Sequence, residues 1–184
     1  DTESGEQLSD KIEWVKFSGA SWAPDGKGFY YSAYDKPEKG VYSSQNQFQK
    51  VYYHKLGDAQ TADELIYWDA QHPLRYFSGE ESGDGKWQFV HASEGTSGSE
   101  VLYRKKGERK FRTLLEGFAY DYAIVTVEDD YAYVLTNDAA PNFRLAKINL
   151  VRPAGLEDVI AENPEVLLET VSAVGGVLVA TYME

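Results

Sequence analysis

Cysteine is absent from the sequence, and histidine is scarce, with three among 184 residues. Without cysteine the chain has no disulfide, no thiolate metal ligand and no cysteine nucleophile. His54, His72 and His91 include no pair with metal-ligand spacing, so we expect neither a metal site nor a cofactor. The alternation around His54 and His91 predicts half-buried strand positions, and His72 precedes Pro73 in a connection, so we assign no catalytic role to any of them.

Positive charge is also in short supply. Lysine and arginine total 18 against 30 aspartates and glutamates, which gives a net charge of −12. Binding to a phosphate backbone needs clustered Lys and Arg, so we expect no nucleic-acid partner. No apolar run approaches the roughly 20 residues of a membrane helix, and the acidic, polar first ten residues do not resemble a signal peptide. We therefore expect no membrane association, and the acidity indicates a solvated surface.

What the sequence does contain is a series of short apolar runs rich in Val, Tyr and Phe, separated by Gly, Asp and Pro turn signals. These runs have the length of strands and are short for helices. They begin at Phe29, Val51, Leu65, Trp87, Val101, Tyr131, Leu145 and Val177. The one helix-like stretch, Gly155 to Asn163, competes with a strand at Val159 and Ile160. We predict an all-β chain.

An internal repeat organises these strands. A tight turn followed by a strongly apolar strand occurs four times, with spacings of 59, 45 and 46 residues, at Asp25-Gly26, Asp84-Gly85, Asp129-Asp130 and Gly175-Gly176. Four short strands in about 45 residues are typical of a β-propeller blade. A single β-sandwich would explain the density of strands but not their fixed period, so we favour blades.

The repeat predicts a partial β-propeller of about four blades, each a four-stranded antiparallel sheet. The blades are expected at roughly 11–69, 70–117, 118–163 and, in part, 164–184, with one strand before the first complete blade and two after the third. Such a chain reads as a piece of a larger propeller. Its unpaired edges are expected either to pair with a second copy or to fray.

The first period is longer than the others because of a polar insertion from Tyr34 to Gln49. A loop of this length inside a compact fold is often functional or mobile. A tolerated surface insertion is the alternative interpretation.

No active-site motif stands out in the sequence. There is no G-x-S-x-G nucleophile elbow, and the stretch that begins at Gly95 has the wrong spacing. Neighbouring carboxylates occur at Glu80-Glu81 and Asp129-Asp130, but nothing fixes two of them at a working separation, and Asp129-Asp130 fits a hairpin turn. The aromatic residues within the predicted strands could form a sugar-stacking platform or could pack between neighbouring blades, and we favour packing. These residues are Tyr30, Tyr31, Tyr52, Tyr53, Tyr67 and Trp68.

Several segments resemble the propeller domain of prolyl oligopeptidases, serine peptidases that cleave short peptides after proline. They are Val15-Lys-Phe-Ser-Gly-Ala-Ser-Trp22, Asp25-Gly-Lys-Gly-Phe-Tyr-Tyr31, Lys50-Val-Tyr-Tyr-His-Lys-Leu-Gly57, Ser93-Glu-Gly95 and Pro141-Asn-Phe-Arg-Leu145. The matching segments keep the family's order over nearly the whole chain.

The resemblance implies a seven-bladed propeller joined to an α/β-hydrolase domain with a Ser-Asp-His triad. The hydrolase domain, its nucleophile elbow and its triad have no counterpart in these residues. The expected role is therefore that of a non-catalytic, substrate-gating fragment of a prolyl endopeptidase. Its expected partners are the hydrolase domain of the same parent chain and short proline-containing peptides.

The resemblance also implies site residues. Phe17 would line an apolar substrate subsite, with Tyr76 or Phe77 and Thr96 close to it; ordinary blade packing is the alternative for Phe17 and Phe77. Ser93 stands where the family often has an arginine that contacts substrate, a departure that weakens polar substrate binding by this blade. The insertion from Tyr34 to Gln49 matches the position of a mobile loop linked in the family to access.

Two other function classes remain open on the sequence alone. The first is a stand-alone β-domain for protein or carbohydrate binding, and the second is a free-standing hydrolase built on acidic pairs. The expected location is the cytoplasm, with the periplasm as the alternative.

Overall fold

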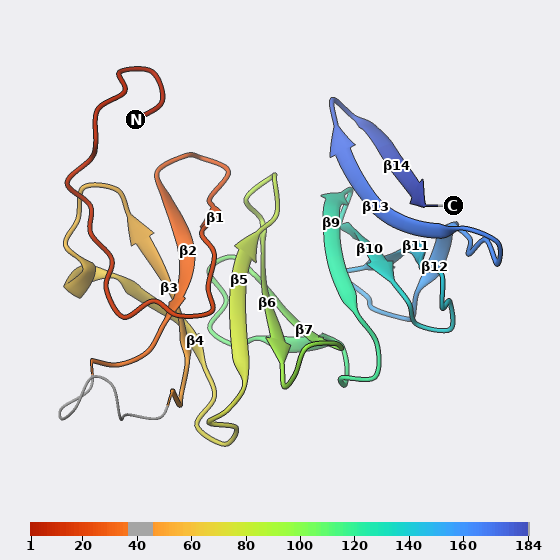
Figure 1. The fold of residues 1–184 in the computed structure, drawn as a ribbon, viewed down its shortest axis with the longest axis horizontal. Helices are drawn as coiled ribbons and strands as arrows, with labels where there is room; N and C mark the ends of the chain where they lie inside the picture. The colour runs from red at the N-terminus through yellow and green to blue at the C-terminus, as the bar shows by residue number, and fades with distance from the viewer. Residues whose placement is uncertain (37–45, 184) are drawn as a thin grey trace.

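The computed structural model describes residues 1–36 and 46–183 as a row of antiparallel β-sheets joined by short connections (Figure 1). Within these two ranges, three sheets have four strands and the last sheet has two. In every sheet the strands are hydrogen-bonded in chain order, so each sheet is a simple meander. The helical content of the described residues is one short 3-10 turn, η1, at Gln60–Ala62.

We call the four sheets blades 1 to 4. Blade 1 comprises β1 (Ser21–Trp22), β2 (Gly28–Ala33), β3 (Lys50–Lys55) and β4 (Glu64–Trp68). Blade 2 comprises β5 (Tyr76–Glu81), β6 (Trp87–Ser93), β7 (Glu100–Lys105) and β8 (Arg112–Leu115). Blade 3 comprises β9 (Tyr122–Glu128), β10 (Tyr131–Thr136), β11 (Arg144–Asn149) and β12 (Glu157–Ile160). Blade 4 comprises β13 (Leu167–Val174) and β14 (Val177–Met183). The predicted all-β, partial propeller fold is confirmed.

The tight turns follow from residues that accept a left-handed backbone. Asp129 and Asp130 connect β9 to β10 with φ angles of 49° and 62°, and Gly175 and Gly176 connect β13 to β14 with 59° and 78°. Two successive positive φ angles match the right-handed twist of the flanking strands, and Asp and Gly are residues that tolerate them. The prediction that Asp129-Asp130 is a hairpin turn, and not a catalytic pair, agrees with this geometry.

The core lies between successive blades. Phe89 and Val90 are neighbours on β6, and strand neighbours point to opposite faces. Phe89 enters the apolar cluster shared with blade 3, whereas Val90 enters the cluster shared with blade 1. A third cluster joins blade 3 to blade 4 around Leu145 and Leu168. Both faces of β6 are thus covered, which explains why the adjacent residues Phe89 and Val90 are both apolar.

The strand tyrosines take part in this packing. Tyr30 faces blade 2, with its ring centroid 5.1 Å from that of Tyr53. Tyr31 points to the other face of blade 1 and stacks on Tyr52 at 5.6 Å. Packing is therefore the use that the structure gives these rings.

Of the two alternatives for Gly155 to Asn163, the structure contains the strand: β12 covers Val159 and Ile160 and pairs with β11. The strand expected before blade 1 is wrong, because residues 6–20 form no strand. This N-terminal segment, which we define as residues 1–20, is attached to blade 1 mainly through side chains, as described below.

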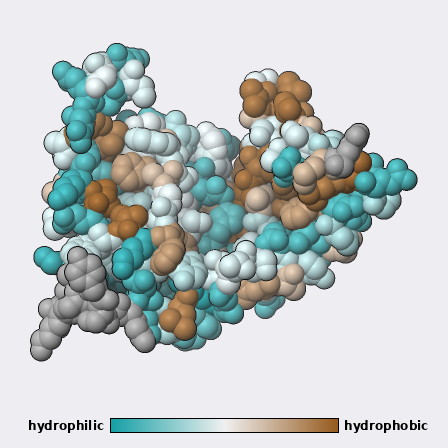
Figure 2. All heavy atoms as spheres, viewed as in Figure 1, coloured by the Kyte–Doolittle hydropathy of each residue, from teal (hydrophilic) through white to brown (hydrophobic). Residues whose placement is uncertain are grey.

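The hairpin of blade 4 leaves apolar side chains exposed at its tip. Val174 and Val177 are each 63% exposed, and they lie where Figure 2 shows a brown patch at the end of the β13–β14 hairpin. Among the described residues, no helix has the length and apolar character needed to cross a bilayer.

Candidate functional site

An exposed aromatic pair lies where the N-terminal segment meets blade 2. Phe17 is 66% exposed, and Tyr76, the first residue of β5, is 36% exposed. Their ring centroids are 5.3 Å apart and their planes are inclined by 73°, an edge-to-face contact. We call Phe17 and Tyr76 the aromatic pair. Two accessible rings in contact offer an apolar surface to a ligand.

Phe77 has a different environment from its neighbour. Its side chain is 3% exposed and belongs to the cluster between blades 1 and 2, with its ring centroid 5.2 Å from that of Tyr67. Side chains alternate along β5, so only one of the two adjacent aromatics reaches the surface. Of the two residues that the sequence left open, Tyr76 is the one that contacts Phe17.

The β5–β6 ladder determines the position of the other expected residues. Ser93 lies opposite Tyr76 in that ladder and is half-buried. Thr96 is exposed on the bend that follows β6. The structure therefore brings Ser93 to the aromatic pair through the strand register, whereas Thr96 lies beyond the end of the ladder.

Sequence reasoning missed Arg75, which precedes Tyr76. Its Nε donates a 2.8 Å hydrogen bond to Glu94 Oε1, and its Nη2 forms an ion pair with the same oxygen at 2.8 Å. Its Cζ lies 4.7 Å from the ring centroid of Phe118. Glu94 follows Ser93, so an arginine reaches this corner from the opposite strand. The carboxylate of Glu94 neutralises the charge of Arg75. Only the pairing of β5 with β6 could have indicated that Arg75 lies close to Ser93.

The backbone beside Phe17 is fixed by hydroxyl groups. Ser18 Oγ accepts a 2.8 Å hydrogen bond from the Ser32 backbone N–H. The buried Ser32 hydroxyl donates at 2.6 Å to the carbonyl of Phe77. Ser32 on β2 therefore links the N-terminal segment to β5, the two parts that carry the aromatic pair.

A cavity of about 160 Å³ lies next to these hydroxyls. It is lined by three short stretches, residues 18–21, 30–32 and 78–80. The serines of the lining supply hydroxyl donors and acceptors. No histidine accompanies them: each of the three histidines of the chain bonds a carboxylate, His72 to Asp69 and His91 to Glu80, for example.

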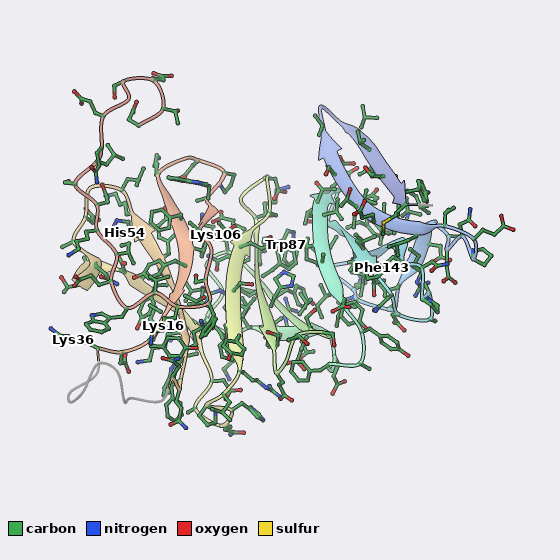
Figure 3. All side chains as sticks on the ribbon, viewed as in Figure 1. Lys16, Lys36, His54, Trp87, Lys106 and Phe143 are labelled. Atoms are coloured by element: carbon green, nitrogen blue, oxygen red, sulfur yellow. The ribbon has the colours of Figure 1, made fainter. Side chains whose placement is uncertain are left out.

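His54 is buried completely, and not half-buried as the sequence predicts. Its Nδ1 lies 2.7 Å from Asp63 Oδ1 and its Nε2 lies 3.0 Å from Asp10 Oδ1. Figure 3 shows His54 between the N-terminal segment and blade 1. Burial by itself lowers the pKa of the imidazole, but the hydrogen bonds to Asp63 and Asp10 outweigh it and raise the pKa of His54. We call these three residues the His54 clasp.

Two further expectations concern the surroundings of the site. Most of the polar insertion predicted from Tyr34 to Gln49 lies outside the described residues. Within residues 1–36 and 46–183, no group of His, Asp and Glu side chains has an arrangement that could hold a metal ion.

Comparison with known proteins gives a consistent result. A family model described as the prolyl oligopeptidase N-terminal beta-propeller domain matches residues 1–184. The prolyl endopeptidase of Elizabethkingia miricola is 38% identical over the whole chain, which spans 26% of that protein. The dual function macrocyclase-peptidase of Galerina marginata is 29% identical over 90% of the chain and is covered to 24%.

Solved structures show the same similarity in space. One of two prolyl endopeptidases analysed for inter-domain dynamics matches the whole chain with a TM-score of 0.86 at 30% identity, and the chain covers 28% of it. Prolyl oligopeptidase B from Galerina marginata, bound to a 35mer hydrolysis and macrocyclization substrate, matches 95% of the chain with a TM-score of 0.85 at 29% identity, and is covered to 26%. The chain thus spans about a quarter of the length of these relatives.

Proposed function

Because the chain belongs to the prolyl oligopeptidase N-terminal β-propeller family, we propose that it is the non-catalytic propeller part of a serine peptidase that cleaves short peptides after proline. The chain spans 26% of the Elizabethkingia miricola relative, and catalysis is assigned to the remainder of the parent protein. The proposed partner in that remainder is an α/β-hydrolase domain that supplies the nucleophile. The proposed ligands are short proline-containing peptides.

The observation that carries this proposal is the exposed aromatic pair. Phe17 and Tyr76 present accessible rings in edge-to-face contact at the junction of the N-terminal segment and blade 2. Proline-rich segments bind aromatic-lined grooves because the polyproline II conformation is already formed and loses little entropy on binding. The pair is therefore suited to contact a peptide near its proline.

The second part of the proposal concerns admission of substrate. A propeller with a narrow or gated channel lets an extended oligopeptide reach a buried site but excludes a folded protein. The meanders of blades 1 to 3 support such a role, because each is a continuous sheet of four hydrogen-bonded strands. The relative from Galerina marginata was solved bound to a 35mer hydrolysis and macrocyclization substrate, and a peptide is the class of ligand that we propose here.

The test uses the full-length parent protein with a fluorogenic Gly-Pro peptide. Phe17→Ala and Tyr76→Ala should each raise KM about two- to tenfold, the worth of one aromatic contact. The kcat value should change little, because the pair lies on a domain that does no bond making or breaking. Trp68→Ala is the matched control, since this exposed aromatic lies on β4, at the far edge of blade 1.

Two results would overturn the proposal. Cleavage of the reporter by residues 1–184 alone, free of contaminating peptidase, would show that the chain is itself catalytic. An unchanged KM in both aromatic variants would remove the pair from the substrate path.

A further inference from the structure

Gln49 is a buried polar residue that the activity proposed above does not use. Its side chain is fully buried at the point where the chain enters β3. A buried amide group is costly unless its donors and acceptor are satisfied. Among the described residues, the side chain of Gln49 forms hydrogen bonds with three backbone groups, and all three lie at or next to the aromatic pair.

The amide nitrogen of Gln49 holds the N-terminal segment. Its Nε2 donates to the carbonyl of Lys16 at 2.9 Å and, more weakly, to that of Phe17 at 3.5 Å. Phe17 has a φ of 54°, a left-handed conformation that a phenylalanine rarely adopts. A side-chain amide that binds the carbonyls on both sides of this residue stabilises the unusual backbone and with it the direction of the ring.

The amide oxygen of Gln49 holds the other half of the site. Its Oε1 accepts a 2.6 Å hydrogen bond from the backbone N–H of Phe77, the residue after Tyr76. One side chain therefore binds the backbone beside both members of the aromatic pair, although the pair's members are 59 residues apart in sequence. Figure 3 shows Lys16 near the lower end of β2, on the N-terminal segment.

We propose that Gln49 is the positioning residue of the site: it sets the edge-to-face geometry of Phe17 and Tyr76 and so determines how well the propeller binds the apolar part of a peptide substrate. This inference rests on the proposed function. It adds a residue that does not touch the substrate and acts through Phe17. Binding is sensitive to such a residue because a ring that must be ordered on binding loses affinity to entropy.

The experiment uses the full-length parent protein and a double-mutant cycle between Gln49→Ala and Phe17→Ala. The substrates are two fluorogenic Gly-Pro peptides. On the amino-terminal side of Gly-Pro, one carries a bulky apolar residue and the other carries a glycine. Gln49→Ala should raise KM for the bulky peptide about two- to tenfold, as Phe17→Ala does, with little change in kcat. In the Phe17→Ala background the substitution at Gln49 should add almost nothing, because the group through which it acts is gone.

Two variants separate positioning from general stability. Gln88→Ala removes another buried glutamine, whose side-chain hydrogen bonds go to Tyr30 and Arg104 and not to the N-terminal segment. It should lower the melting temperature and leave KM unchanged. Gln49→Glu keeps the size and the acceptor for Phe77 but loses the donor to Lys16. It should raise KM while its fold is retained.

Each outcome decides the question. If Phe17→Ala raises KM but Gln49→Ala and Gln49→Glu do not, the positioning role is refuted and the proposed function survives. If neither Phe17→Ala nor Tyr76→Ala raises KM, the proposed function itself fails. If both Gln49 variants fail to fold while Gln88→Ala folds, Gln49 is a structural residue and the inference is overturned.

Discussion

Removal of the His54 imidazole tests how the N-terminal segment is attached to blade 1. The side chains of His54 and Asp63 are 1% and 2% exposed, and Asp63 Oδ2 also accepts a 2.6 Å hydrogen bond from the Tyr31 hydroxyl. His54→Gln would leave the Asp63 carboxylate buried without its cationic partner. Breaking a buried pair in this way costs about 3–5 kcal/mol of unfolding free energy, which is a large part of the roughly 5–15 kcal/mol of a whole domain.

The matched control is His91→Gln. His91 forms a similar contact with Glu80 at 2.8 Å, but the two side chains are 19% and 34% exposed. A pair that reaches solvent contributes about 0–1 kcal/mol. Urea unfolding of both variants near pH 6, followed by tryptophan fluorescence, measures the difference directly.

The pH dependence gives a second readout with a definite sign. Folding raises the pKa of His54, so its contribution to stability is complete below the unfolded value of about 6.5 and is lost as pH rises through the higher folded value. The Gly57 backbone N–H, and then His54, lower the pKa of Asp10, so its contribution is lost only as pH falls through that lower folded value. The stability difference between the wild type and His54→Gln should therefore shrink above about pH 6.5.

The groups that face the imidazole are Asp10 from the N-terminal segment, Asp63 from the end of η1 and the ring of Phe29, whose centroid lies 5.3 Å away. Hydrogen exchange of the Gly57 amide, which donates to Asp10 at 2.5 Å, reports the clasp locally. The reasoning is refuted if His54→Gln costs no more than His91→Gln, or if the stability difference grows with rising pH.

Two further predictions concern the sheets. Leu145→Ala, at a fully buried position in the cluster between blades 3 and 4, should cost about 2–5 kcal/mol in urea unfolding and reduce hydrogen-exchange protection in β13; full protection there would contradict the described core. Gly98→Ala should cost about 1–3 kcal/mol more than Gly107→Ala in thermal unfolding, because a Cβ at Gly98 would collide with the backbone of Phe118, whereas Gly107 has a similar positive φ and open space. Equal costs at the two glycines would count against that packing.

The strands and turns of the blades could be predicted from the sequence because the residue patterns that indicate them are local. A hairpin turn such as Asp129-Asp130 needs residues that tolerate positive φ, and both the turn and the flanking alternation can be read within a dozen residues. The stretch from Gly155 was ambiguous because its four-residue strand is too short for its period to be distinguished from a helix. Here the ladder to β11 determines the outcome, and a ladder is not visible in one segment.

The candidate site was accessible only in part, for the same reason. Phe17 and Ser93 were named from a resemblance, but the choice between Tyr76 and Phe77 depends on which face of β5 looks outward. That face is decided by the register that pairs Tyr76 with Ser93. Gln49 carried no signal, because its partners at Lys16 and Phe77 lie 33 and 28 residues away along the chain.

The two halves of the aromatic pair are held by different kinds of structure. Tyr76 belongs to a strand whose backbone is hydrogen-bonded in a regular ladder, so its position depends on many bonds at once. The N-terminal segment that carries Phe17 has no ladder. One backbone hydrogen bond, from the Tyr34 N–H to the Trp14 carbonyl, joins it to the chain after β2. Its other attachments are single side chains, for example at Asp10 by the His54 clasp and at Glu13 by two hydrogen bonds to Gln60. A segment attached in this way can shift when one side chain changes while the blade beneath it stays folded. The geometry of the pair is therefore more sensitive to substitutions under the N-terminal segment than to substitutions within blade 2, and those buried polar side chains are where changes in peptide binding without loss of the fold are expected.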